Sequence, residues 1–304
     1  TVFSFGGEIA NTDAGVIIAA DALCDRLGLD TISMGVVAGF VMELYEKGIL
    51  SAQELDGLKP QWGNLEVLFK LIDKVTKREG IGNILADGTR QAVQMIGKGA
   101  EYYAMTAKGL ELPGYEPRAA KAHGLGYAVS NIGGSHMYGY ARQEISGFAQ
   151  PREIDRFADE GKGDIAGWNQ IKKAVEETGI LCNFADTNIS QQLICDLFVS
   201  ATGRSDLADA KSINKFGERI VCLERCFNVR EGFSRKDDTL PERMFKEPLK
   251  NAGPSTGQVI RKMDSLLDEY YDFMGYDKNG IPTVEKLNDL GLGEVAPDVS
   301  KFRK

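Results

Sequence analysis

Two carboxylates stand at the end of a helical segment near the start of the chain. Asp25 lies in the last turn of a helix predicted over residues 13–27, and Asp30 follows the Gly28 that ends it. A carboxylate in the last turn faces the negative end of the helix dipole, which costs about 0.3 to 1 kcal/mol. Because Asp25 is unfavourable for the helix, its presence indicates a role other than helix stability. A structural role stays open for both residues, because Asp30 is also placed to cap the next helix.

Both histidines of the chain lie in a glycine-rich stretch over residues 121–136. Its glycines allow the backbone to approach a ligand or a neighbouring helix closely. His136 follows Gly-Gly-Ser in a predicted turn and is a candidate for acid–base chemistry, whereas a hydrogen-bonded structural role is favoured for His123. Neither belongs to a His-Glu-x-x-His pair, so the stretch does not predict that type of metal site.

The spacing of the first motif recurs before Cys182: an acid, two further residues, a residue pair and a final polar side chain. Such spacing is common, and a cysteine is more often a small buried hydrophobe than a ligand. Cys222 and Cys226, four residues apart on another predicted helix, lack further ligands nearby and are interpreted as core residues. The alignment of the two motifs pairs Glu177 with Asp25, Ile180 with Gly28, Leu181 with Leu29 and Cys182 with Asp30.

Helices must position these residues, because apolar side chains recur at helical spacing with little period-two alternation. Residues 161–167 are expected to be loose, and the charged run over residues 229–243 is either a solvated loop or a fixed network. A stretch rich in Gly and Pro over residues 97–117 marks the domain boundary, so we predict domains over residues 1–110 and 111–304. The predicted helices cover residues 13–27, 35–47, 65–78, 84–96, a segment leading to 176, 190–201, 213–229 and 258–274.

Composition limits the class of protein. The 304 residues can bury a large core and suggest about two domains. With 36 Lys and Arg against 44 Asp and Glu, the net charge of -8 argues against a dedicated nucleic-acid binder. No apolar run approaches the roughly 20 residues of a membrane helix. Five cysteines indicate a reducing cytoplasm, and the opening Thr-Val-Phe leads us to expect the interior of a longer polypeptide.

Five stretches carry a resemblance to a known family. The most specific is FNVREGFSRKDDTLPER over residues 227–243. The chain resembles, along nearly its whole length, the C-terminal two domains of the tungstopterin aldehyde:ferredoxin oxidoreductase family. The other four stretches are residues 29–35 (LDTISMG), 80–88 (GIGNILADG), 112–118 (LPGYEPR) and 268–275 (DEYYDFMG).

The resemblance implies an all-α, multihelical fold of two helical domains, with the family's N-terminal pterin-binding β domain absent from this chain. It implies two pyranopterins holding one tungsten (or molybdenum), a 4Fe-4S cluster and, as an option, Mg. Pterin amino and ring N–H groups need ionised acceptors, and each such bond is worth about 1.5 to 3 kcal/mol. The family binds its two pterins through paired sequence motifs. The first motif is matched fully by Asp25, Gly28, Leu29 and Asp30.

The second pterin motif is matched in part. Glu177 and Leu181 occupy its positions, but Glu replaces Asp and Ile180 replaces the glycine. Cys182 matches the family's fourth cluster cysteine, which is bound as thiolate. His136 aligns with the family's active-site histidine, the proposed proton donor or acceptor.

Other parts of the family's site would align upstream of Thr1. They are three cluster cysteines in a Cys-x-x-Cys-x-x-x-Cys run, the β domain and an active-site Glu. None occurs in this chain. We therefore expect an upstream domain or a second subunit to supply them, and we predict that residues 1–304 alone are inactive and free of cofactor.

The implied function is oxidation of small aldehydes to carboxylic acids, with ferredoxin as electron acceptor. One alternative is the tungsten subunit of the anaerobic benzoyl-CoA reductase, which shares the framework but reduces a ring. An alternative of another class is a non-catalytic helical scaffold that lacks the cofactor. We expect no nucleic-acid or membrane partner, and a homodimer stays open.

Overall fold

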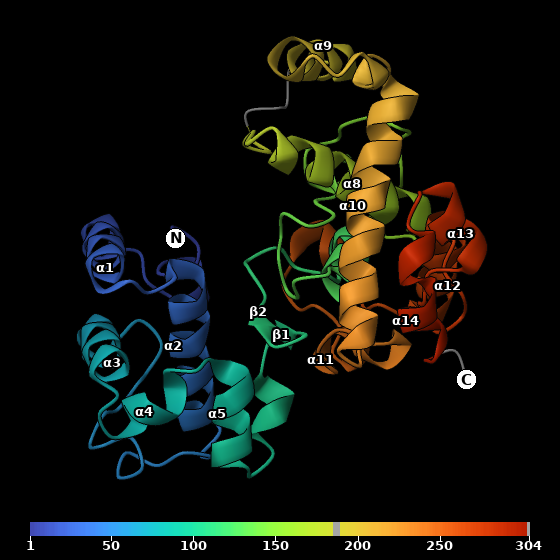
Figure 1. Ribbon diagram of the computed structural model, residues 1–304. Coiled ribbons are helices and arrows are strands. Elements are labelled where there is room, and N and C mark those ends of the chain that lie inside the picture. Colours follow the sequence, from blue (N-terminus) through green and yellow to red (C-terminus); the bar gives the residue numbers. More distant parts are fainter. Residues whose placement is uncertain (185–188, 303–304) are drawn as a thin grey trace. The chain divides into compact units, whose positions relative to one another are not determined.

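The computed structural model describes residues 1–184 and 189–302 and confirms the all-α fold (Figure 1). Among these residues, the strands form one short antiparallel pair, β1 (Thr106–Ala107) with β2 (Leu110–Glu111). The chain divides into two compact units. The first comprises Thr1–Glu116, Ile132–Ser135 and Leu240–Glu247, and the second comprises Pro117–Asn131, His136–Thr239 and Pro248–Lys304. The division into domains at residues 110 and 111 stays a prediction.

The core of the first unit is built around α2 (Thr31–Glu46), which is buried on nearly every side from Met34 to Leu44. A helix that is apolar all round must be enclosed by other elements. In Figure 1, α2 runs through the blue and teal part of the chain, and it contacts α1 (Ala14–Leu27), α3 (Leu65–Lys77) and β2. The remaining elements of this unit are η1 (Gly7–Ile9), α4 (Ile81–Leu85), α5 (Thr89–Ile96), η2 (Ala100–Tyr103) and α11 (Arg243–Lys246).

The chain turns sharply between α1 and α2. The predicted cap of α1 is confirmed, since Gly28 is left-handed with φ of 71°. No single helix within residues 1–184 and 189–302 is long and apolar enough to cross a membrane; α1 and α2 meet that criterion only as a pair, across a bend of 115°.

The single helix predicted over residues 84–96 is wrong, because the chain forms α4 and α5 separately. Each start is satisfied by a carboxylate from elsewhere in the sequence. The N–H of Ile81 donates to Asp56 at 2.9 Å, and the N–H of Thr89 donates to Glu111 at 2.8 Å. Glu111 thus satisfies a backbone donor that a continuous helix over residues 84–96 would have paired internally, and Asp56 satisfies one that the start of a helix leaves without an internal partner.

The second unit is organised by α8 (Gly163–Thr178), which packs against α6 (Lys121–Val129), α10 (Ala210–Arg230) and α12 (Met263–Met274). Figure 1 shows α10 as the long orange helix with α8 beside it. Gly217 of α10 permits this approach, because a Cβ there would contact the carbonyl oxygen of Ile171. The remaining elements are α7 (Arg142–Ile145), α9 (Gln191–Thr202), η4 (Ser205–Leu207), η5 (Arg235–Asp237), η6 (Gly253–Ser255), α13 (Val284–Asp289), η7 (Gly293–Val295) and α14 (Ala296–Ser300).

The prediction that residues 161–167 are loose is wrong, because α8 begins at Gly163. The carboxylate of Glu269 accepts the N–H groups of Gly161 at 2.8 Å and Lys162 at 2.7 Å. It therefore supplies the cap of α8. Gly163 allows α8 to lie close to α12 and does not make the backbone flexible, since a Cβ there would overlap the backbone of Glu269.

Charges of the run over residues 229–243 join a fixed network rather than only a solvated loop. Arg225 is 2% exposed and donates from Nη1 and Nη2 to Asp238 at 3.0 and 2.8 Å. Its Nε donates to the carbonyl of Gly280 at 2.7 Å, and the Tyr271 hydroxyl donates to Asp238 at 2.6 Å. A buried pair is tolerated when its remaining hydrogen-bonding groups are satisfied in this way.

Candidate functional site

The first motif forms the corner between α1 and α2. The N–H of Leu29 donates to the carbonyl of Cys24 at 2.9 Å, which closes the last turn of α1 around Gly28. Asp30 is the N-cap of α2, and its Oδ1 accepts the N–H of Ser33 at 2.7 Å. The structural role foreseen for Asp30 is therefore present, and it uses one carboxylate oxygen of the two.

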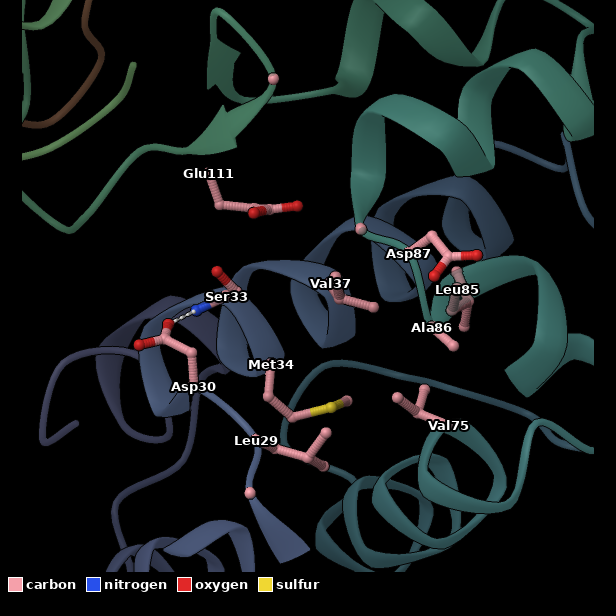
Figure 2. A pocket seen from close by; sticks show the side chains of 13 residues that line it. Leu29, Asp30, Ser33, Met34, Val37, Val75, Leu85, Ala86, Asp87 and Glu111 are labelled. Carbon is pink, nitrogen blue, oxygen red and sulfur yellow. Dashed lines mark hydrogen bonds between the residues drawn. The ribbon is translucent and has the colours of Figure 1, made fainter. Parts of the chain in front are cut away.

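A pocket of about 390 Å³ opens beside this corner, within the first unit (Figure 2). Gly28, Leu29 and Asp30 all line it, whereas Asp25 is exposed and lies outside the described lining. Figure 2 shows Glu111 on one side of the space and Leu29 and Met34 opposite. A cavity of this size holds a small organic ligand rather than a lone ion.

Sequence reasoning missed Glu111, which supplies the pocket's buried carboxylate. Its side chain is 5% exposed, and its Oε1 accepts the N–H of Thr89 at 2.8 Å. Gly88 leaves room for it, because a Cβ there would lie 3.0 Å from Oε1. The available signal was that Glu111 is the one charged residue in the stretch over residues 109–114, GLELPG.

The charge of the pocket favours a ligand rich in N–H donors. Asp30, Asp87 and Glu111 line it, and its described lining includes no Lys or Arg. Arg78 hydrogen-bonds Asp87 and thereby holds the pKa of that carboxyl below its ordinary value. Asp30 and Glu111 already serve two helix N-termini, so these ends are not left open to an anion. Apolar side chains complete the lining: Leu29, Met34, Val37, Val75, Leu85 and Ala86.

The second motif lies at the end of α8 in the second unit. Ile180 is left-handed with φ of 56° and is 93% exposed. The N–H of Leu181 donates to the carbonyl of Glu176 at 2.9 Å, and Leu181 packs on a core cluster that includes Phe198. Glu177 is exposed and pairs at 3.1 Å with Lys173 of the same helix, whose side chain is buried.

Cys182 differs from the other four cysteines in being exposed. Burial and neighbouring carboxylates, among them Asp25 and Asp30, raise the pKa of Cys24 to about 11. Burial also raises the pKa of Cys195. Within residues 1–184 and 189–302, no group of three or more His, Cys, Asp or Glu side chains is placed to hold a metal ion. The Cys182 thiol is accessible, whereas the other four thiols are buried.

The two histidines differ in their surroundings. His123 of α6 is 1% exposed, its Nδ1 accepts the N–H of Ala141 at 3.3 Å, and burial followed by the nearby His136 lowers its pKa to about 3. His123 therefore stays neutral and structural. His136 is half-buried and stacks on Phe184, with ring centroids 6.4 Å apart. The structure thus brings His136 next to the loop that carries Cys182.

Comparison with known proteins gives a consistent result. Residues 1–292 match the family described as aldehyde ferredoxin oxidoreductase, domains 2 & 3. The tungsten-containing aldehyde ferredoxin oxidoreductase of Pyrococcus furiosus is 37% identical over 297 residues, covering 97% of this chain and 48% of the relative. The counterpart from Thermococcus kodakarensis is 36% identical over the same shares. The chain thus spans about half the length of these relatives.

Two further matches are named for different activities. The aliphatic sulfonate oxidoreductase, WOR-like subunit, of Pyrococcus furiosus is 32% identical over 95% of this chain and 44% of the relative. Among solved structures, the active-site complex BamBC of benzoyl coenzyme A reductase, in complex with 1,5-dienoyl-CoA, aligns with a TM-score of 0.73 and 26% identity. That alignment covers 95% of this chain and 48% of the solved chain.

Proposed function

Because the chain belongs to the aldehyde ferredoxin oxidoreductase family, whose domains 2 and 3 it matches, we propose that it forms this part of a tungsten–pterin enzyme. The enzyme oxidises aldehydes to carboxylic acids and passes the electrons to ferredoxin. The observation that carries this proposal is the pocket beside Asp30, where the pterin motif borders an acceptor-lined cavity. An upstream part of the same protein, or a second subunit, completes the site.

The pocket suits the polar edge of a pterin. Asp30 and Glu111 provide carboxylate oxygens for amino and ring N–H groups, while Leu29 and Met34 provide apolar contact for the ring. Asp25 lies outside the described lining, and its part in pterin binding is proposed from the motif alone. When bound, the tungsten–pterin group supplies the two-electron redox chemistry, and the protein supplies binding and orientation.

The second unit provides proton transfer and an electron exit. His136 accepts or donates a proton during aldehyde oxidation, and such general acid–base assistance is typically worth about 10² to 10⁴ in rate. Cys182 is a thiolate ligand of a 4Fe-4S cluster, and its exposure makes the sulfur accessible. Glu177 and Leu181 contribute the second pterin motif. Leu181 acts by packing against the core cluster that includes Phe198, which holds the motif in place.

The test uses the complete protein that contains this chain, produced anaerobically with tungstate. We expect the protein to hold tungsten, pterin and iron and to reduce viologen and ferredoxin when aldehyde is added. Purified protein without tungsten and iron would contradict the proposal and support the non-catalytic helical scaffold.

A matched pair of variants tests the pocket itself. Asp30→Asn keeps the helix cap, because Asn caps as well as Asp, but it loses the ionised acceptor. Its pterin affinity should fall roughly ten- to a hundredfold, as should that of Glu111→Gln, which still accepts the Thr89 N–H. Asp13→Asn is the control, since Asp13 caps α1 and lies outside the lining. Equal pterin content in all three variants would contradict the assignment.

Reduction of the aromatic ring of a benzoyl thioester is the second candidate, because the solved structure with a TM-score of 0.73 is a benzoyl-CoA reductase complex. The two candidates separate in one assay series on the complete protein. Aldehyde-dependent reduction of viologen supports the first. Oxidation of 1,5-dienoyl-CoA, with no response to aldehydes, would support the second.

A further inference from the structure

The residues on both sides of Cys182 are held by hydrogen bonds to buried groups. Leu181 is fixed by its backbone bond to Glu176. Asn183 is 5% exposed, and both its carbonyl oxygen and its side-chain Oδ1 accept hydrogen bonds from Nη2 of Arg142, the second at 2.8 Å. The thiol between them is exposed, but its backbone is anchored on either side.

Arg142 is itself an unusual residue for this position, because it is 3% exposed at the start of the short helix α7. Its Nη2 lies 3.9 Å from Oε1 of Glu176, which is fully buried and also pairs with Lys172 at 3.0 Å. Burying charged groups is expensive unless they are paired and hydrogen-bonded. The ion pair offsets the cost of burying Arg142, and its two hydrogen bonds to Asn183 orient the guanidinium toward the residue that follows Cys182.

The same loop contacts the histidine through an aromatic side chain. Phe184 stacks on His136 with an interplanar angle of 30° and meets the ring of Tyr140 edge-on, with centroids 5.7 Å apart. Tyr140 in turn meets the ring of the buried His123 at 5.4 Å. Arg142 follows Tyr140 by two residues, so one short segment contacts the Cys182 loop through both a guanidinium and an aromatic ring.

We propose that Arg142 is a positioning residue that fixes the Cys182 loop against the segment from His136 to Arg142. Its hydrogen bonds to Asn183 fix the backbone next to Cys182 and so set the position of the cluster ligand. Phe184 follows Asn183 and stacks on His136, so the same bonds also set the position of the histidine. This inference rests on the functions proposed above for Cys182 and His136. Arginine suits the task because the two N–H groups of its Nη2 lie in the rigid guanidinium plane and hold both Asn183 acceptors in a fixed arrangement, which a lysine ammonium does not reproduce.

The experiment compares Arg142→Lys, Arg142→Met and Asn183→Ala in the complete, tungsten- and iron-loaded protein. Arg225→Lys is the matched control, since Arg225 is an equally buried arginine in a separate ion-pair network of this unit. The readouts are iron content, the electron paramagnetic resonance spectrum of the reduced cluster, its midpoint potential and the single-turnover rate of aldehyde oxidation.

We expect Arg142→Lys and Asn183→Ala to keep full iron content and to show an altered cluster spectrum. Arg142→Met should also lower the midpoint potential, because it removes a cation that favours the reduced cluster. The single-turnover rate in the Arg142 variants should fall roughly ten- to a hundredfold with little change in aldehyde affinity, as misplaced groups produce. Arg225→Lys should lose stability while its cluster spectrum and potential stay those of the wild type.

Wild-type spectra, potentials and rates in Arg142→Lys and Asn183→Ala would overturn the inference even if Arg142→Met fails to fold. That result would leave the proposed function intact, because the wild-type protein would still carry its cluster. A wild-type protein that contains no iron would instead overturn the proposed function and this inference together.

Discussion

The ends of α1 and α8 have the same backbone geometry although their sequences match only in part. At each end the third residue after the acid is left-handed, with φ of 71° at Gly28 and 56° at Ile180. At each end the next N–H, from Leu29 or Leu181, donates at 2.9 Å to the carbonyl one residue before the acid. The weak spacing match in the sequence is therefore a repeated turn in the structure.

The residues after the turn differ between the two ends. After the first, Asp30 caps α2 and lines the pocket. After the second, Cys182 is exposed and Asn183 is buried against Arg142. One type of turn thus presents a carboxylate at one site and a thiol at the other. The shared feature is the backbone, and the chemistry depends on the residue that comes after it.

The largest effect should come from Cys182→Ser, which asks whether the thiol is the functional group of the second end. We expect loss of iron and a fall in ferredoxin reduction beyond the roughly 10- to 100-fold typical of losing a group that only supports a metal ligand. Iron per chain and ferredoxin-dependent turnover measure it in the complete protein. Cys195→Ser, at a buried cysteine, should keep its iron and lose only stability. Normal iron and turnover in Cys182→Ser would show that the thiol is not the functional group at the end of α8.

Local signals in the sequence predicted much of this fold. Glycines after Leu27, Thr202 and Met274 end α1, α9 and α12 as expected, because a left-handed cap depends on few neighbours. The errors arose where distant groups decide. Gly163 reads as a breaker in isolation, yet the carboxylate of Glu269 and the close approach of α12 place it inside α8.

The candidate site was predicted to a similar extent. The position of Leu29 and Asp30 at a helix corner follows from capping rules, and both residues line the pocket. Glu111 could not be identified, because its importance depends on approaching Thr89 from 22 residues away in sequence. The link from Arg142 to Asn183 spans 41 residues and likewise has no local signal.

Exchanging the left-handed residues tests whether the two turns are equivalent. Gly28→Ile should destabilise the apo protein by roughly 1–2 kcal/mol, the penalty for a side chain in this conformation, since no atom lies within 4 Å of a Cβ there. Ile180→Gly should recover part of that amount, offset by the greater entropy of an unfolded glycine. Chemical denaturation of the complete apo protein measures both. Opposite signs support equivalence, whereas a loss of stability in Ile180→Gly would show that the entropy of the unfolded glycine outweighs the relief of the left-handed isoleucine.

Removing the final side chain of each motif should distinguish the capping end from the exposed end. Asp30→Ala should cost the apo protein about 0.5–2 kcal/mol through loss of the α2 cap. Cys182→Ala should stay within roughly 0.5 kcal/mol of the wild type, because the thiol is exposed. Asp30→Asn is the control and should keep wild-type stability. Equal losses in Asp30→Ala and Asp30→Asn would show that the carboxylate charge, and not the cap, stabilises the corner.

The smallest effects are expected from the acids that open the two motifs. Asp25 lies at the negative end of the α1 dipole, so Asp25→Asn should leave the stability of the apo protein unchanged or raise it by up to about 1 kcal/mol. Glu177 occupies the same place on α8 but pairs with the buried Lys173. Glu177→Gln therefore relieves the unfavourable dipole contact and weakens this ion pair, with an expected net loss of no more than about 1 kcal/mol. Pterin content of the loaded protein should nevertheless fall in Asp25→Asn. Lower apo stability with normal pterin content would instead make Asp25 a structural residue and leave Asp30 and Glu111 as the carboxylates of the first site.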